Sequence, residues 1–202
     1  MKDKIKEAVK TYNKIAELYS KYNFEKLLQF QLSKFISLLP GKKVLDVGCG
    51  MGRDVAYFME EKLDVIGIDL SEKMIEEAKK RVKKGKFKIM DFRKTDFKDG
   101  SFDGVWSMAG FIHVSKTEMP KLLKEMNRIL KKDGIIYIAI KEGKGEKEVK
   151  APKYKGEPRT FVLYQQLELE EFLKNAGFEV VNSDTSQEEF GDKWVEIFAK
   201  KV

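Results

Sequence analysis

The chain has 202 residues, of which 42% are hydrophobic, and a formal net charge of +7 at pH 7. This length fits one domain with a sizeable core, and the hydrophobic content excludes a disordered chain. No apolar run approaches the ~18 residues of a membrane span, and a single cysteine excludes a disulfide framework. Residues 1–4 open a charged segment without the apolar stretch of a signal peptide, so we expect a cytoplasmic protein.

The basic excess makes nucleic-acid binding a function class to weigh. Only five of the 40 basic residues are arginine, the side chain favoured for phosphate and base recognition. The lysines are scattered among glutamates along the chain, and abundant Lys and Glu with few Asn and Gln are typical of heat-adapted proteins. The densest basic run, residues 79–84, falls at the end of a predicted helix, where cations offset the helix dipole. We therefore expect a solvated, thermophile-like surface rather than a nucleic-acid footprint.

In chain order, apolar residues at helical spacing first predict two helices, the second ending at Pro40 and Gly41. Strands and helices then alternate, which favours a parallel sheet with helices on both faces. The expected strands cover residues 43–48, 64–69, 86–91, 102–107 and 134–141. The expected helices cover residues 52–61, 71–83 and 116–131. Ser115 and Glu118 have the spacing of a capping box for the last of these helices.

The remainder of the chain predicts a loop, a helix and two strands. Residues 142–158 are rich in Gly, Lys and Pro and predict a mobile loop. A helix over residues 166–176 is followed by strands at 178–184 and 193–199, which are too close for a crossover helix, so one pair must be antiparallel. We expect a single domain over 1–202, with a helical cap at 1–40 and an α/β core at 41–202.

The most informative motif follows the first strand, where Asp46, Gly48, Gly50 and Gly52 occupy alternate positions. Glycines there let the backbone turn sharply and approach a ligand closely. A dinucleotide fingerprint would place its third glycine where this chain has Arg53. The motif therefore favours an adenosine-containing cofactor that bears an ammonium and a sulfonium, namely S-adenosylmethionine. The alternative is a tight strand–helix turn without a ligand.

A second acid supports the cofactor interpretation. Asp69 is the last residue of the second apolar strand. Its distance along the chain from Asp46 is close to the ~20 residues expected of an acid that accepts hydrogen bonds from a ribose diol. It can also cap the helix that begins near Ser71, and both roles are compatible. Cys49 lies inside the glycine turn, where a small buried residue is expected rather than a nucleophile.

With these motifs, residues 44–140 resemble the class I S-adenosylmethionine-dependent methyltransferases, especially the small-molecule branch of the ubiquinone-biosynthesis and tellurite-resistance types. The resemblance implies a doubly wound, Rossmann-like sheet of seven mainly parallel strands with one antiparallel strand. It implies that Asp91 contacts the adenine amino group, with Phe92 beside the ring. The cofactor-binding residues that we predict are Tyr19, Asp46, Gly48, Cys49, Gly50, Gly52, Asp69, Leu70, Met74, Asp91, Phe92, Ser107 and Met108.

The acceptor side is less defined by the sequence. Displacement at a sulfonium methyl group needs mainly proximity and orientation, and it needs a base only when the acceptor must lose a proton. His113, the only histidine, follows the fourth strand and is either the catalytic candidate or a structural residue. Tyr12 and Tyr19 lie on the first helix, which often covers the cofactor in the resembling branch, and they can equally pack in the core. No His and Cys spacing suggests a metal site.

We therefore expect a monomeric or homodimeric enzyme that methylates a small molecule, without a membrane or nucleic-acid partner. The first helical segment and residues 142–158 would form a two-part lid. Alternatives are an RNA-base or protein methyltransferase and, less favoured, a non-catalytic cofactor-binding protein. A base-directed enzyme often carries an Asp/Asn-Pro-Pro-Tyr-like motif after the fourth strand, where this chain reads Ser107, Met108, Ala109 and Gly110.

Overall fold

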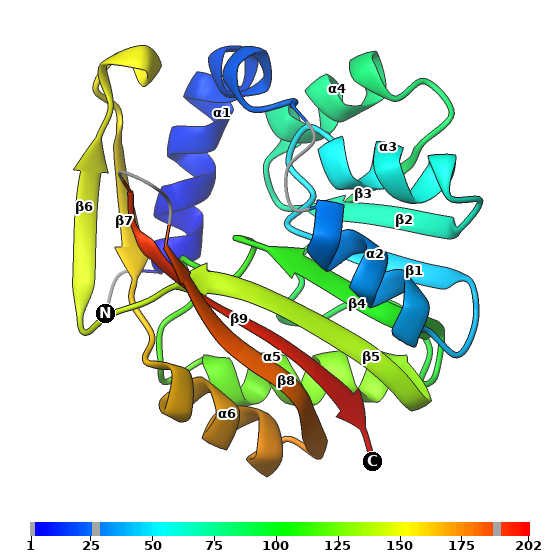
Figure 1. The fold of residues 1–202 in the computed structure, drawn as a ribbon. Helices are drawn as coiled ribbons and strands as arrows, with labels where there is room; N and C mark the ends of the chain where they lie inside the picture. Colours follow the sequence, from blue (N-terminus) through cyan, green and yellow to red (C-terminus); the bar gives the residue numbers. More distant parts are fainter. Residues whose placement is uncertain (1–2, 26–28, 188–190) are drawn as a thin grey trace.

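The structure, a computed structural model, describes residues 3–25, 29–187 and 191–202. Its centre is a seven-stranded sheet in the order β3-β2-β1-β4-β5-β9-β8 (Figure 1). The strands are β1 (Lys43–Val47), β2 (Asp64–Asp69), β3 (Lys86–Ile89), β4 (Phe102–Met108), β5 (Leu130–Lys141), β8 (Phe178–Gln187) and β9 (Lys193–Lys201). Within this sheet β9 runs antiparallel to both of its neighbours, and the other described pairings are parallel. The predicted fold class, with one antiparallel strand, is confirmed.

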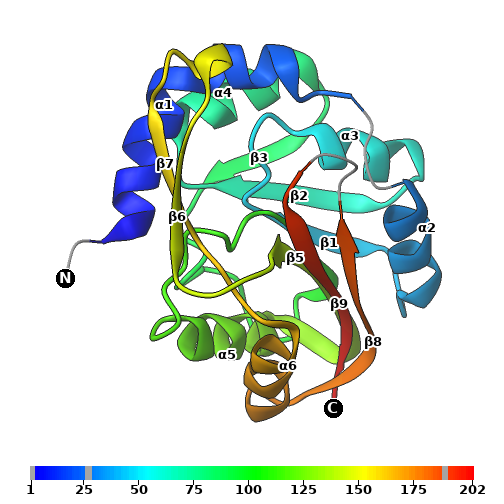
Figure 2. The same cartoon turned by 60° about the vertical axis from the view of Figure 1, so that its left-hand side comes forward.

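Helices cover both faces of the sheet (Figures 1 and 2). On one face lie α2 (Gln29–Leu38), α3 (Arg53–Glu60) and α4 (Glu72–Arg81), and on the other lie α5 (Met119–Ile129) and α6 (Gln166–Asn175). The long helix α1 (Lys4–Tyr22) packs beside α4. Connections between parallel strands place helices on the faces, so the middle strands are buried on both sides and read as near-continuous apolar runs.

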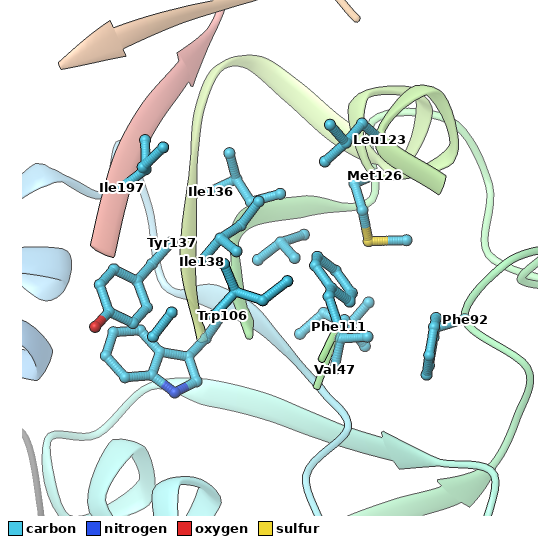
Figure 3. Close-up of a cluster of buried hydrophobic side chains, with 14 of the residues drawn as sticks. Val47, Phe92, Trp106, Phe111, Leu123, Met126, Ile136, Tyr137, Ile138 and Ile197 are labelled. Carbon is cyan, nitrogen blue, oxygen red and sulfur yellow. The ribbon is translucent and has the colours of Figure 1, made fainter. Parts of the chain in front are cut away.

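The core is centred on β4 and β5 (Figure 3). Trp106 of β4 stacks on Tyr137 of β5, with ring centroids 4.0 Å apart. Phe35 of α2 packs against the same indole at 5.3 Å. These large side chains bury the most apolar surface per residue and fix the middle of the sheet, so the carboxyl ends of β1 and β4 are held rigidly beside each other.

Helix α5 begins at Met119, later than the expected start at residue 116. Ser115 and Glu118 do not form a capping box. The Ser115 hydroxyl donates to the Glu118 carboxylate at 2.8 Å, and the same carboxylate accepts a hydrogen bond from Arg93. Pro120 lies in the first turn of α5, where its missing N–H costs no hydrogen bond. The proline therefore sets the start of the helix instead of the predicted cap.

Strand β5 begins at Leu130 rather than at residue 134. Its first residues include Asp133, which has φ of 63°, and the pairing with β4 shifts register between Phe102 and Gly104. Asp is one of the few residue types that tolerates the left-handed region. Residues 130–133 thus form an irregular start to a strand that is longer than the expected one at 134–141.

The prediction of a mobile loop over residues 142–158 is wrong. The chain instead forms β6 (Glu146–Lys150), the short 3-10 helix η1 (Pro152–Tyr154) and β7 (Pro158–Val162), in which β6 and β7 pair antiparallel. Gly145 before β6 and Gly156 before β7 have positive φ, so they bend the chain without interrupting the ladder. We call residues 146–162 the hairpin. Figure 2 shows the hairpin standing alongside α1.

Two further features concern the described part of the chain alone. None of its helices has both the length and the apolar character that crossing a bilayer requires. Nor do the described residues bring together three His, Cys, Asp or Glu side chains in a metal-binding group.

Candidate functional site

A cavity lies at the carboxyl ends of β1, β2 and β4, beneath α1. Open α/β sheets bind ligands at this edge because loops and helix N-termini converge there. The predicted site residues that line it are Tyr19, Asp46, Gly48, Cys49, Gly50, Asp69, Leu70, Met74, Phe92, Met108 and His113. Three predicted residues, Gly52, Asp91 and Ser107, are not among those that line the cavity. The topology thus brings segments that are far apart in the sequence to one place.

Backbone conformation and packing both require glycine in the turn after β1. Gly48, Gly50 and Gly52 have φ of 72°, 52° and 81°, a region that other residues rarely adopt. A Cβ on Gly48 would lie 2.6 Å from the backbone of Gly110, whereas one on Gly50 would meet open space. A Cβ on Gly52 would lie 2.8 Å from the ring of Phe87, so this glycine serves the packing of α3 rather than the cavity wall.

Asp69 links the glycine turn to the start of α4. One carboxylate oxygen accepts the Gly50 N–H at 3.0 Å, and the other accepts the Ser71 N–H at 2.8 Å. Burial raises the pKa of Asp69, and these backbone donors oppose the rise. Each carboxylate oxygen has more than one lone pair, so Asp69 retains acceptor capacity toward the cavity that it lines.

Asp46 is a buried acid with an oxygen that nothing in the described chain satisfies. It is only 3% exposed, and its Oδ2 has no hydrogen-bond partner. Burial and the neighbouring Asp54 raise its pKa well above the usual value. Buried polar atoms are nearly always paired, so an unpaired carboxylate oxygen at a cavity indicates a position for a donor group of a ligand.

A second charged group, Arg53 with Asp54, is not among the residues predicted from the sequence. The Arg53 guanidinium donates two hydrogen bonds to the Asp54 carboxylate, at 2.7 Å and 3.0 Å. Trp106 donates its indole N–H to the same carboxylate at 2.9 Å. Both Arg53 and Asp54 line the cavity. The sequence held a signal for Arg53, because a cation at the first position of a helix is unfavourable next to the helix dipole and therefore indicates a role other than helix stability.

Helix α1 forms the roof of the cavity. Ile5, Ala8, Val9 and Tyr12 line it together with the predicted Tyr19. The roof is attached to the Asp69 loop through Asn13, whose side-chain oxygen accepts the Ser71 hydroxyl at 2.7 Å and the Lys73 N–H at 3.2 Å. The apolar face of α1 therefore closes the cavity from above, and its polar face fixes the helix in place.

The hairpin supports α1 from the other side. Thr11 donates its hydroxyl hydrogen to the Pro158 carbonyl at 3.0 Å, and Lys14 pairs with Glu157 at 3.0 Å. Tyr19 packs against Tyr154 with ring centroids 5.5 Å apart. The two segments that we expect to form the lid are thus in direct contact.

His113 lies between α1 and the hairpin and is 7% exposed. Its Nδ1 donates to the Thr160 carbonyl at 2.8 Å, which leaves Nε2 as the acceptor facing the Tyr12 hydroxyl at 3.3 Å. Burial lowers the pKa of His113 to about 4, and burial raises the pKa of Tyr12. At neutral pH both side chains are therefore uncharged.

The carboxylate of Asp91 does not line the cavity and instead bonds to Arg93. This carboxylate is held by the Arg93 guanidinium at 2.7 Å, and the same guanidinium contacts Asp3 and Glu118. Burial opposes ionisation of Asp91, but the hydrogen bonds from Arg93 hold its pKa below the usual value.

The next residue, Phe92, does line the cavity and packs against Phe111. Ser107 is buried, and its hydroxyl has no partner in the described chain.

Comparison with known proteins finds similarity to methyltransferases. A model of the methyltransferase domain matches residues 44–134. A demethylmenaquinone methyltransferase of Thermotoga maritima is 34% identical over 144 residues, which cover 66% of this chain and 61% of that protein. The chain spans less than two thirds of the length of the curated relatives that it first matches.

Solved structures share the fold. A Methanosarcina mazei S-adenosylmethionine-dependent methyltransferase superposes with a TM-score of 0.77 at 20% identity, covering 88% of this chain and 99% of that one. The Burkholderia thailandensis 1,6-didemethyltoxoflavin-N1-methyltransferase, with its substrate and S-adenosylhomocysteine bound, gives a TM-score of 0.68 at 23% identity. That match covers 86% of this chain and 76% of the Burkholderia chain.

Proposed function

We propose that this chain is a class I S-adenosylmethionine-dependent methyltransferase and that it transfers a methyl group from S-adenosylmethionine to a small molecule. The observation that carries the proposal is the cavity that joins the glycine turn, Asp46 and Asp69 beneath an apolar roof. The Thermotoga maritima relative is named for a menaquinone precursor, and the Burkholderia structure holds a small heterocyclic acceptor, which supports a small-molecule acceptor here.

The residues present fit the cofactor. The unpaired oxygen of Asp46 and the free acceptor capacity of Asp69 suit an ammonium and a ribose diol. Arg53 supplies a cation held in place by Asp54, which suits the α-carboxylate of the same molecule. Cys49, Leu70, Met74, Phe92 and Met108 supply the apolar surroundings in this proposal. When bound, the cofactor supplies a methyl group already activated by its sulfonium.

The chain's own contribution to the reaction is orientation and exclusion of water. Helix α1, which the hairpin supports, covers the cavity with Ile5, Ala8 and Val9, so that an acceptor beneath it is held against the cofactor position. The neutral His113 has its Nε2 lone pair directed to the Tyr12 hydroxyl. In this proposal His113 is the general base for an acceptor that must lose a proton, once the acceptor replaces Tyr12 as the partner of Nε2.

The proposal treats residues 1–202 as one methyltransferase domain, with 1–40 as its cap, acting in the cytoplasm as a monomer or homodimer. RNA-base or protein methylation is the alternative. The contacts between Thr11 and Pro158 and between Lys14 and Glu157 favour the small molecule, because a covered cavity obstructs a folded macromolecule.

Calorimetry tests the proposal. S-adenosylmethionine and S-adenosylhomocysteine are expected to bind far more tightly than NAD. Asp69→Ala is expected to cost about 1–3 kcal/mol of that binding because the ribose hydroxyls lose a charged acceptor. The matched control is Asp64→Ala, an exposed acid at the other end of β2 that pairs with Lys86. Equal affinity for NAD would refute the proposal, and an unchanged affinity in Asp69→Ala would remove Asp69 from the site.

A further inference from the structure

Arg159 of the hairpin is a cation whose charge no acid of the described chain balances. Its guanidinium carbon lies 4.6 Å from the ring centroid of Tyr154 and 5.4 Å from that of Phe161. Among the residues that the structure describes, no carboxylate forms an ion pair with it, and its Nε is buried without a hydrogen-bond partner. Removing a charged donor from water is costly unless it is paired, so this geometry indicates a partner that is not part of the described chain.

The guanidinium borders the cavity through uncharged side chains. Tyr154, against which Arg159 lies, packs on Tyr19 with ring centroids 5.5 Å apart, and Phe161 packs on His113 at 5.6 Å. Tyr19 and His113 line the cavity together with Tyr12. Because the two phenols and the imidazole are neutral at pH 7, Arg159 brings a full positive charge to this side of the cavity. The acid nearby in the hairpin, Glu157, is paired with Lys14.

We infer that Arg159 recognises an anionic oxygen group, a carboxylate or a phosphate monoester, on the methyl acceptor. The inference rests on the proposed function and adds the chemical class of the acceptor. A guanidinium presents a planar fork that matches two oxygens of such an anion. The rings of Tyr154 and Phe161 hold the fork in an apolar setting, where its attraction for an anion is stronger than in water. A purely cationic acceptor would be repelled at this position.

The experiment uses simple probes on the whole protein saturated with S-adenosylhomocysteine. Benzoate and phenyl phosphate are titrated calorimetrically against benzyl alcohol, which has a similar ring but no charge. The anions are expected to bind at least about tenfold more tightly than the alcohol, as for a hydrogen bond to a charged group. Benzoate and phenyl phosphate together tell which of the two anions the fork prefers.

Variants locate the anion site. Arg159→Gln is expected to remove the preference for the anions, and Arg159→Lys to retain part of it because the charge stays but the fork is lost. The control is Lys153→Gln, which neutralises an exposed cation lying 5.1 Å from the ring of the same Tyr154. It is expected to leave the binding of benzoate and phenyl phosphate unchanged.

S-adenosylhomocysteine is titrated into every protein first, which separates a failure of the proposed function from a failure of this inference. A wild-type protein that fails to bind it contradicts the proposed function and this inference with it. Normal cofactor binding with no preference for the anions, or an undiminished preference in Arg159→Gln, overturns the inference alone. If Arg159→Gln does not fold, the Arg159 Nε–H resonance of the wild-type protein decides: a shift on adding benzoate supports the inference, and no shift overturns it.

Discussion

Trp106 donates its indole N–H to the buried carboxylate of Asp54 at 2.9 Å, so a side chain at the centre of the sheet holds a charged group at the cavity. Asp54 in turn accepts both hydrogen bonds that fix Arg53. Figure 3 shows the indole beside Tyr137, whose ring stacks on it. The position of Arg53 therefore depends on the packing of β4 and β5, which no local motif encodes.

Replacing Asp54 by Asn is expected to weaken both folding and cofactor binding. The variant loses the charge opposite Arg53, at a cost of about 1–3 kcal/mol in the free energy of unfolding. Because Arg53 is then no longer held, S-adenosylhomocysteine is expected to bind about tenfold more weakly. Urea denaturation and calorimetry measure the two effects.

The control for Asp54 is Asp103→Asn. Asp103 is also a buried acid, and it accepts hydrogen bonds from the Lys43 N–H and from Lys131, at the start of β4 and away from the cavity. This variant is expected to lose stability but to keep its affinity for S-adenosylhomocysteine. A similar loss of affinity in both variants would show that the effect of Asp54→Asn is a general consequence of destabilisation.

His113 gives the protein a defined response to acid. Its pKa lies at about 4 in the folded chain, against an ordinary value of 6.5. Between these pH values the unfolded chain binds a proton that the folded chain rejects, so this contribution to stability is complete above pH 6.5 and is lost as the pH falls toward 4. The loss is at most about 1.4 kcal/mol per pH unit within the window.

Urea denaturation at several pH values checks this, with His113→Gln as the reference. The raised pKa values of Asp46 and Asp69 act in the opposite direction in both proteins, so only the difference between them reports on His113. Since the chain has one histidine, an NMR titration follows it without ambiguity. A midpoint near 6.5 would contradict the buried, neutral imidazole.

Asp91 is expected to distinguish adenine from hypoxanthine. If its carboxylate accepts the adenine amino group, Asp91→Asn reduces the preference for adenosyl over inosyl analogues in calorimetry. The competing interpretation is that Asp91 only stabilises the turn, since it also accepts the Arg93 N–H at 2.9 Å. Glu118→Gln, which alters another acid on the same guanidinium, is the control. An unchanged preference in Asp91→Asn would assign the residue to the turn.

The roof is expected to be needed for binding but not for the sheet. Deleting residues 1–20 should weaken binding of S-adenosylhomocysteine and abolish turnover, because Tyr12 and Tyr19 leave the cavity wall. Circular dichroism checks that the sheet remains folded. Full activity of the truncated protein would refute the lid and reopen a macromolecular acceptor.

A milder change tests the same attachment without removing the helix. Asn13→Ala removes the oxygen that binds Ser71 and the Lys73 N–H, so α1 is expected to open more often and S-adenosylhomocysteine to dissociate faster. Lys10→Ala, at an exposed position on α1, is the control. Equal dissociation rates in stopped-flow measurements would place the attachment elsewhere.

The sequence by itself determined the alternating core, the antiparallel strand and the glycine turn with its two acids. These features depend on local rules: apolar periodicity, the short gap between the last two strands, and φ values that only glycine adopts readily. Asp46 and Asp69 could be placed together because parallel strands end at one edge of a sheet.

Only the tertiary structure decided which polar groups meet. Arg93 binds Asp91 near it in sequence, but also Asp3 far from it, and these contacts engage the carboxylate that the sequence predicts as an adenine ligand. The hairpin formed where a loop was expected because residues 146–150 pair with residues 158–162, a partnership that composition does not reveal. Arg53 owes its position to Asp54, which accepts a hydrogen bond from the distant Trp106, and Arg159 lies against Tyr154 within the hairpin. Long-range packing sets these partners, and it therefore also sets the charge that an acceptor meets.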